Sequence, residues 1–309
     1  MTILDAIILG LVEGITEYLP VSSTGHLIIT SSLLGLDRDA DTKSAVDAFN
    51  IIIQGGAILA VIGLYRVRVW SMIQGLLGKS AGGRRLFTNL VIAFLPAAVF
   101  GVLLDELIEA ALFRPWPVIG ALAVGGLVLI GMKRWQDRVF ASAEGDDSQD
   151  RFIDIEHLTW KQALLIGFLQ CIAMWPGTSR SMMTIVGGML VGLRPKHAAE
   201  FSFLLGLPTL GGACVYKALK SGDEIAALGA APIVVGIAVA TVSAAVAVKW
   251  LVGYLAKHGL AAFGWYRIAL AAVLGGLWLG GIVQFGAGST EVEDASSDPT
   301  TSISTPSAD

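Results

Sequence analysis

The segment DAIILGLVEGITEYLPVSSTG (residues 5–25) decides the fold, because it is largely apolar yet carries Glu13, Glu17 and a polar turn after Pro20. A single straight transmembrane helix would leave these carboxylates in lipid, where a charge costs about 2.5–3.5 kcal/mol on insertion scales. Two helices joined by a turn, entering and leaving on one side, would bury them in protein instead. The sequence therefore predicts a re-entrant element over residues 3–34.

A second broken segment, residues 162–193, has the same layout, with a Pro-Gly turn followed by Thr, Ser and Arg. Laid on residues 5–25 with one gap, it pairs Gly167 with Gly10, Gln170 with Glu13, Pro176 with Pro20 and Ser179 with Ser23. Each segment precedes three apolar stretches, and the two halves begin on opposite sides of the membrane. This layout is typical of inverted repeats whose broken helices meet at a midplane site; a chance likeness of two apolar segments is the alternative.

The composition indicates an integral membrane protein. Apolar residues make up 54% and charged residues 15%, and the mean hydropathy is +0.71, whereas soluble domains are about one quarter charged. A transmembrane helix needs about 20 apolar residues. Six stretches are predicted to span the membrane: 48–65, 86–104, 115–132, 198–216, 225–248 and 268–288. The net charge of −4 argues against a nucleic-acid partner.

The predicted fold is an all-α integral membrane protein with about six transmembrane helices and two re-entrant helix–turn–helix segments arranged as an inverted repeat. The first repeat is expected over residues 1–140 and the second over 161–288. Residues 141–160 form an acidic cytoplasmic loop between them. Residues 289–309, rich in Ser, Thr, Asp and Pro, are expected to be a disordered tail.

The placement of basic residues predicts the orientation. With the 66–85 loop in the cytoplasm, about three times as many Lys and Arg side chains fall inside as outside, as the positive-inside rule requires. Both termini are then expected outside. On this count Arg267 belongs to the cytoplasmic boundary of the last span, and Arg180 is the only strongly basic residue far from a span end.

Glu13 and Glu17 are four residues apart and therefore share one face of the first helix. Carboxylates and water suit Mg²⁺ or Ca²⁺. The pair predicts a shared divalent cation or a carboxylate that orients a catalytic histidine. A buried or interfacial acid pair satisfied by its neighbours is the structural alternative.

The first turn, PVSSTGH (20–26), combines three hydroxyls, a glycine and an imidazole. Ser22, Ser23 and Thr24 can donate to phosphate oxygens, and any of them is a possible nucleophile beside a base. His26 suits acid–base chemistry near neutral pH. The structural alternative is a simple N-cap for the following helix.

The second turn, PGTSRS (176–181), holds Arg180, whose planar guanidinium suits phosphate. Thr178, Ser179 and Ser181 are candidate phosphate donors beside it. These residues precede a helix, and a helix N-terminus favours anions. The turn therefore predicts a phosphate site.

An arginine at the midplane needs an anion, and an ion pair with Glu13 or Glu17 is the structural alternative. In a richer interpretation, a carboxylate pairs with Arg180 at rest and the substrate phosphate displaces or joins it. Gln54 and Glu200 are weaker candidates that would act on the substrate-binding residues without touching the substrate themselves. A purely structural role is equally possible for both.

LGLVEGITEYLPVSSTGHL (9–27) and PGTSRSMMTIVGGMLVGL (176–193) closely resemble the two signatures of the undecaprenyl-diphosphate phosphatase family, also called BacA or UppP. Supporting similarity runs through FNIIIQGGAILAV (49–61) and AAEFSFLLGLPTLGGA (198–213), within a resemblance over roughly residues 3–285. The family usually reads SRSG in the second signature, and Met182 replaces that glycine here. The arginine and both serines are kept, so we expect activity with a tighter pocket.

The resemblance implies a multi-pass enzyme of the bacterial cell membrane that removes the terminal phosphate of undecaprenyl diphosphate. This reaction recycles the lipid carrier of peptidoglycan synthesis and lessens sensitivity to bacitracin. The resemblance also implies a divalent-cation requirement, a site that opens to the outer face, and homodimers. Glu13, Glu17, Ser23, His26 and Arg180 take the family's essential places.

Phosphoryl transfer from a diphosphate needs charge neutralisation, a nucleophile and a base. We assign Arg180 to the phosphate, and Glu13 and Glu17 to the cation or to orienting the base. Ser23 is the candidate nucleophile. Water activated by His26, and His26 carrying the phosphoryl group itself, are the two alternatives.

Two other classes share some of these features. Acid-phosphatase-like membrane lipid phosphatases need a histidine six residues after the arginine, where this chain has Val186. A lipid or small-molecule transporter with a midplane anion site would also have inverted repeats. A transporter has less need for clustered Ser, His, Glu and Arg side chains.

Overall fold

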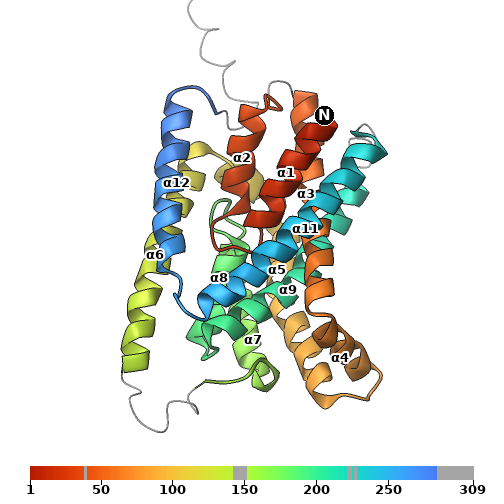
Figure 1. Ribbon diagram of the computed structural model, residues 1–309, viewed down its shortest axis with the longest axis vertical. Helices are drawn as coiled ribbons and strands as arrows, with labels where there is room; N and C mark the ends of the chain where they lie inside the picture. Colours follow the sequence, from red (N-terminus) through yellow and green to blue (C-terminus); the bar gives the residue numbers. More distant parts are fainter. Residues whose placement is uncertain (38–39, 142–151, 221–224, 226–227, 284–309) are drawn as a thin grey trace, which may run out of the picture.

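The computed structural model describes residues 1–37, 40–141, 152–220, 225 and 228–283. This part of the chain folds into helices and contains no β-strand, which confirms the predicted all-α class. The elements are α1 (Ile3–Thr16), α2 (Ser23–Leu33), α3 (Ala40–Leu64), α4 (Arg66–Leu76), α5 (Ala81–Leu112), α6 (Pro115–Ala141), η2 (Ile155–His157), α7 (Trp160–Ile172), α8 (Arg180–Leu190), α9 (Pro195–Lys220), α11 (Ala230–Leu255) and α12 (Ala261–Leu279) (Figure 1). The predicted tail and most of the predicted acidic loop lie outside the described residues.

Six of the described helices, α3, α5, α6, α9, α11 and α12, are long and apolar enough to cross a bilayer, which confirms the predicted number of spans. The predicted ends differ most for α12, which begins at Ala261 and ends at Leu279 instead of covering 268–288. The sequence prediction began this span after Arg267 because a charge usually marks a boundary. The helix instead continues through Arg267, whose guanidinium finds hydrogen-bond partners inside the protein.

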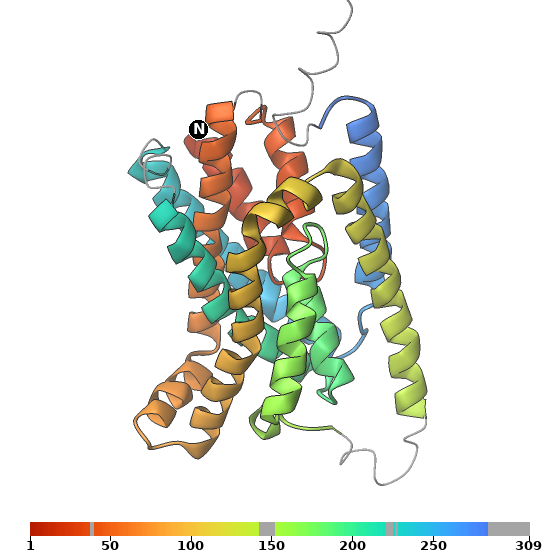
Figure 2. The same cartoon turned by 180° about the vertical axis from the view of Figure 1, so that it is seen from behind.

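The shorter helices form two broken pairs, α1 with α2 and α7 with α8. α1 has 14 residues and α7 has 13, which at 1.5 Å per residue makes each about 20 Å long, short of the about 30 Å hydrocarbon core. α1 packs along α11 and α3, α7 along α5, and α8 along α9. Figures 1 and 2 show the two pairs toward opposite ends of the molecule, with their turns near its middle. The re-entrant path and the inverted repeat remain predictions.

The first helix of each pair, α1 or α7, begins with a capping box. Thr2 Oγ1 accepts from the Asp5 backbone N–H, while the Asp5 carboxylate accepts from the Thr2 backbone N–H. Thr159 and Gln162 make the same capping box before α7. These reciprocal bonds satisfy backbone donors that a helix start leaves open, and so both leading helices are fixed at their first residues.

α1 approaches α11 closely at Gly14, where an added Cβ would lie 2.0 Å from Ser243 Oγ and 2.5 Å from the Ala240 carbonyl oxygen. We expect Gly14→Ala to destabilise the protein by about 1–3 kcal/mol because the two backbones must move apart. Thermal unfolding in detergent measures this effect. Gly63→Ala on α3, where an added Cβ meets open space, is the matched control. Equal melting temperatures for the two variants would contradict the prediction.

Candidate active site

The two turns meet inside the molecule, and Arg180 is their main link. Its Nη2 donates to Glu17 Oε1 at 2.8 Å, and its Nη1 donates to the Ser202 carbonyl oxygen at 3.0 Å. Ser181 Oγ adds a second link by donating to the Leu19 carbonyl oxygen at 2.9 Å. The ion pair that the sequence offers as an alternative is therefore formed, and it joins the two broken segments.

The Arg180 guanidinium keeps donor capacity beyond these bonds. Its Nε is buried and has no hydrogen-bond partner within the described residues. The Tyr18 ring lies with its centroid 5.4 Å from Cζ, and α9 passes so closely that a Cβ at Gly206 would be 3.0 Å from Nη1. A guanidinium held this way suits a phosphate, whose oxygens would accept from the remaining donors.

Glu17 connects the arginine to the candidate nucleophile. Its Oε2 accepts from Ser23 Oγ at 2.8 Å, while its Oε1 accepts from Arg180. Glu17 is the C-cap residue of α1, and Ser23 is the first residue of α2. The turn between these helices therefore folds the serine back onto the carboxylate six residues before it.

Glu13 lies one helical turn before Glu17 and is fully buried. Both of its carboxylate oxygens lack a hydrogen-bond partner within the described residues, and leaving a buried acceptor unsatisfied costs about 1–3 kcal/mol or more. No group of three or more His, Cys, Asp or Glu side chains in this part of the chain forms a complete metal site. Two carboxylates are nevertheless enough for Mg²⁺ when substrate phosphate and water supply the other ligands.

His26 is fixed at both ring nitrogens. Nδ1 lies 2.7 Å from the Ser22 carbonyl oxygen, and Nε2 lies 2.6 Å from the Tyr266 hydroxyl. The rings of His26 and Tyr266 are stacked with their centroids 5.6 Å apart. Because a carbonyl only accepts, Nδ1 carries a hydrogen, and in the neutral ring Nε2 is left as the acceptor. Tyr266 is a contact that the sequence analysis missed.

Ser22 and Ser179 share an unusual backbone conformation. Their φ angles are 73° and 76°, and each residue directly precedes a helix. Residues other than glycine held in this region cost about 1–3 kcal/mol each and cluster at functional sites. The backbone therefore pairs Ser179 with Ser22, one residue from the pairing with Ser23 in the sequence alignment.

The two serines differ in their side-chain contacts. Ser179 Oγ accepts from the Met182 backbone N–H at 3.3 Å and lies 3.0 Å from Ser181 Oγ, so it caps α8. Ser22 makes no side-chain cap for α2. Capping thus accounts for the serine at the second turn only.

The remaining candidate residues are divided between the site and its surroundings. Thr178 is buried in the second turn, and Thr24 is half-buried at the start of α2. Gln54 is half-buried on α3, and Glu200 accepts from Arg68 Nε at 2.8 Å. Neither of these two makes a hydrogen bond to the central arginine or carboxylates within the described residues.

A second arginine also lies inside the protein. Arg267 on α12 is fully buried and donates to the carbonyl oxygens of Gly177 at 2.8 Å, Ala121 at 3.0 Å and Pro20 at 3.5 Å. Arg180 is therefore not the only arginine inside the protein, and Arg267 lies within the α12 span instead of before it. Three carbonyl groups replace water around its charge.

The site is most open where α2 meets α12. Ser23 and His26 are half-buried and Tyr266 is 48% exposed, whereas Glu13 and Ser181 are fully buried. A ligand would therefore meet the serine and histidine first and the deeper carboxylate last.

The fold and this cluster define a multi-pass helical membrane protein with acid, hydroxyl, imidazole and guanidinium groups gathered in its interior. The chain belongs to the bacitracin resistance protein BacA family, whose model matches residues 6–273. Every residue of the cluster lies within the matched range.

Curated relatives are similar over most of their length. A Sorangium cellulosum protein named undecaprenyl-diphosphatase is 46% identical over 277 residues, which is 89% of this chain and 85% of the relative. A Pseudomonas fluorescens protein named undecaprenyl-diphosphatase 1 is 44% identical over 284 residues, 92% of this chain and 97% of the relative. A Chromobacterium violaceum protein with the same name is 41% identical over 283 residues, 91% of this chain and 98% of the relative.

Proposed function

We propose that this chain hydrolyses undecaprenyl diphosphate to undecaprenyl phosphate and inorganic phosphate. The observation that carries the proposal is a pair of 2.8 Å hydrogen bonds to Glu17, one from Arg180 and one from Ser23. In the proposed reaction Arg180 binds the phosphate, Glu17 is the base and Ser23 is the nucleophile. The names of the relatives support the same reaction. The product is the lipid carrier of cell-wall synthesis, so the activity would also lessen sensitivity to bacitracin.

The resting ion pair suggests how substrate triggers the reaction. When the terminal phosphate takes the Arg180 donors, Glu17 Oε1 is released, while Oε2 keeps its hydrogen bond to Ser23 Oγ. Ser23 Oγ then attacks the terminal phosphorus and its proton passes to Glu17. The anhydride P–O bond breaks, undecaprenyl phosphate leaves, and water later hydrolyses the phosphoserine. Attack by water, or by His26, remains an alternative for the first step.

A divalent cation, Mg²⁺ or Ca²⁺, fits the unpartnered Glu13 carboxylate together with Glu17. When bound, it would neutralise charge on the diphosphate oxygens. The fully buried Glu13 and its neighbour Glu17 would be its protein ligands.

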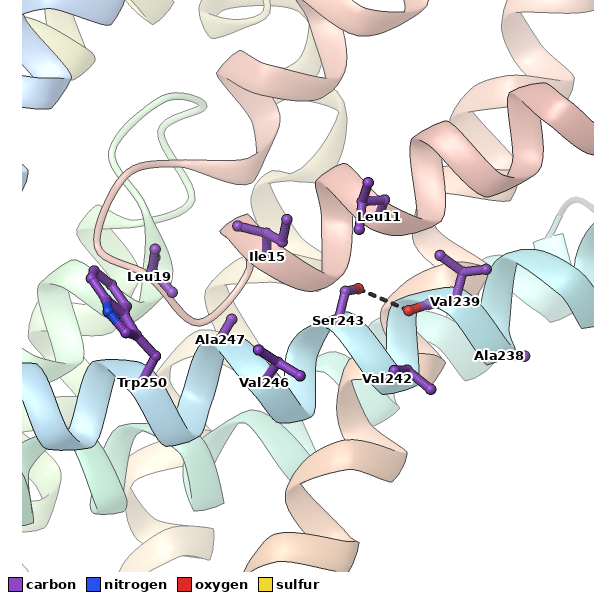
Figure 3. A pocket seen from close by; sticks show the side chains of 10 residues that line it. All are labelled: Leu11, Ile15, Leu19, Ala238, Val239, Val242, Ser243, Val246, Ala247 and Trp250. Carbon is purple, nitrogen blue, oxygen red and sulfur yellow. Dashed lines mark hydrogen bonds between the residues drawn. The ribbon is translucent and has the colours of Figure 1, made fainter.

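The apolar part of the substrate needs a path through the helices. An apolar groove of about 870 Å³ lies between α1 and α11 (Figure 3). Leu11 and Ile15 of α1 and Leu19 of the following turn line one side, and Trp250 lies beside Leu19 at one end. The Leu19 carbonyl accepts from Ser181, so the groove reaches the backbone of the polar site and can carry a prenyl chain to it.

We place the protein in the bacterial inner membrane, with the open α2–α12 side of the site facing outward and with homodimers as the assembled form. The six helices of spanning length support the membrane location. The excess of basic residues on the opposite side supports the outward orientation.

We expect Tyr266→Phe to lower kcat by about 2–10-fold, because a neutral hydrogen bond is worth about 0.5–1.5 kcal/mol and His26 loses one that fixes its ring. Steady-state phosphate release across a pH range measures this loss. Tyr254→Phe is the matched control, because the Tyr254 ring stacks on His258 at 4.7 Å, outside the site. The same kcat in both variants would contradict a role for the His26–Tyr266 contact.

The deciding experiment is phosphate release from C55 and C15 prenyl diphosphates by the purified full-length chain in detergent, with Mg²⁺, with Ca²⁺ and with EDTA. Metal-dependent release supports the proposed function. A folded protein that binds these lipids but releases no phosphate would overturn it in favour of the transporter alternative.

A further inference from the structure

The buried arginine of α12 binds equivalent points on the two turns. Arg267 donates to the carbonyl oxygens of Pro20 and Gly177. Each of these carbonyls stands two residues before the serine with positive φ, Ser22 in the first turn and Ser179 in the second. One guanidinium therefore joins matching positions of two segments that lie far apart in the sequence.

These contacts differ from an ordinary buried ion pair. No carboxylate pairs with Arg267 in the part of the chain that the structure describes; its partners are main-chain carbonyls from both turns and from Ala121 on α6. A buried charge is costly unless it is well hydrogen-bonded. The rigid fork of a guanidinium can reach three carbonyls at once, which a lysine ammonium on a flexible stem does poorly.

α6 is shaped to receive this guanidinium. A Cβ added at Gly125 would lie 2.3 Å from Arg267 Nη2 and 2.8 Å from its Cζ. One residue further on, α6 and α12 touch through Gly126 and Gly264, where added Cβ atoms would lie 2.7 and 2.6 Å from the opposing carbonyl oxygens. The arginine is thus held against α6 with no room for another side chain.

We propose that Arg267 is a positioning residue that sets the spacing of the two turns. The first turn carries Ser23 and follows Glu17, and the second leads into Arg180, so the spacing decides whether these three groups line up on one phosphate. Arg267 acts through the carbonyls of both turns and contacts none of the three. This inference rests on the proposed phosphatase function.

Two substitutions disturb the contact in different ways. Arg267→Lys keeps the positive charge but removes the planar guanidinium. Gly125→Ala keeps the arginine but displaces its side chain. We expect each to lower kcat by ~10²-fold with KM changed little, because a misplacement of about 1 Å can cost that much. The double variant should be no worse than either single one, since both remove the same contact. Gly120→Ala, on the same helix and with open space around the added Cβ, is the matched control.

A second measurement distinguishes a positioning role of Arg267 from a general loss of stability, and it does not depend on the proposed function. Amide hydrogen exchange over residues 17–24 and 175–180 is expected to be faster in Gly125→Ala than in Gly120→Ala, by more than any difference in global stability between the two variants accounts for. Unchanged exchange, or a kcat loss that only follows the unfolded fraction, would overturn the inference. A wild-type chain that releases no phosphate would refute the proposed function instead, and the exchange result would still decide the positioning role.

Discussion

Arg180→Ala is expected to lower phosphate release by at least ~10³-fold, which is the lower end of what an arginine contributes to phosphoryl transfer. Arg180→Lys should recover only a small part of the loss. An ammonium provides a point charge, whereas the guanidinium can hold the Ser202 carbonyl and, in place of Glu17, a phosphate from one planar group. Measurement of kcat/KM with a C15 prenyl diphosphate, alongside thermal unfolding, tests both variants.

Arg68 on α4 is a control for Arg180. Arg68 donates to Glu200 at 2.8 Å and also pairs with Glu156, so it is an arginine with two carboxylate partners and a more exposed side chain than Arg180. Arg68→Ala should lower the melting temperature and leave the kcat of the folded protein nearly unchanged. If the two alanine variants lost activity equally, Arg180 would have a structural role rather than a phosphate-binding one.

The number of spans was predictable because hydropathy is a local property. Continuous apolar runs of the required length are visible in the sequence, and the structure has six such helices. The helix ends were less predictable because they depend on tertiary contacts. Arg267 looks like a boundary charge until its carbonyl partners are known. Residues 261–266, AAFGWY, are apolar enough to extend the helix backwards, and this was the available signal.

The contacts among three candidate residues were also predictable, because one sequence motif sets Glu17 six residues before Ser23 and the other contains Arg180. Each turn is short enough for its polar side chains to stay together. The meeting of the two turns follows only from the proposed repeat symmetry. The sequence did not identify Tyr266 as a partner of His26, because an aromatic residue near a helix end is equally typical of an anchor at the membrane interface.

The supporting role expected for Glu200 illustrates a limit of one-dimensional reasoning. Its position at the start of a span placed it near the site, but it pairs with Arg68 on α4. The sequence analysis treated residues 66–85 as a loop, so this helix was absent from the prediction. A buried acid takes the nearest cation, and that cation lies on an element the hydropathy pattern does not reveal.

Glu13→Gln is expected to affect activity and stability in opposite directions. Removing a carboxylate that holds the cation should lower kcat by about 10²-fold or more, as loss of other transition-state charge stabilisers does. The same change alters a buried carboxyl group whose two oxygens have no hydrogen-bond partner in the described chain. Relief of that cost, about 1–3 kcal/mol for an unsatisfied buried group, should leave the melting temperature equal to or above that of wild type without metal.

The metal response completes the test of Glu13. Wild type should melt at a higher temperature as Mg²⁺ is added, because a ligand that binds only the folded state stabilises it, and Glu13→Gln should lose that shift. Glu200→Gln is the matched control, because Glu200 is also buried but already satisfied by Arg68. It should melt lower, remain active and keep the Mg²⁺ shift. If Glu13→Gln melted lower and kept its Mg²⁺ shift, Glu13 would be a structural acid, and the cation would have to bind elsewhere.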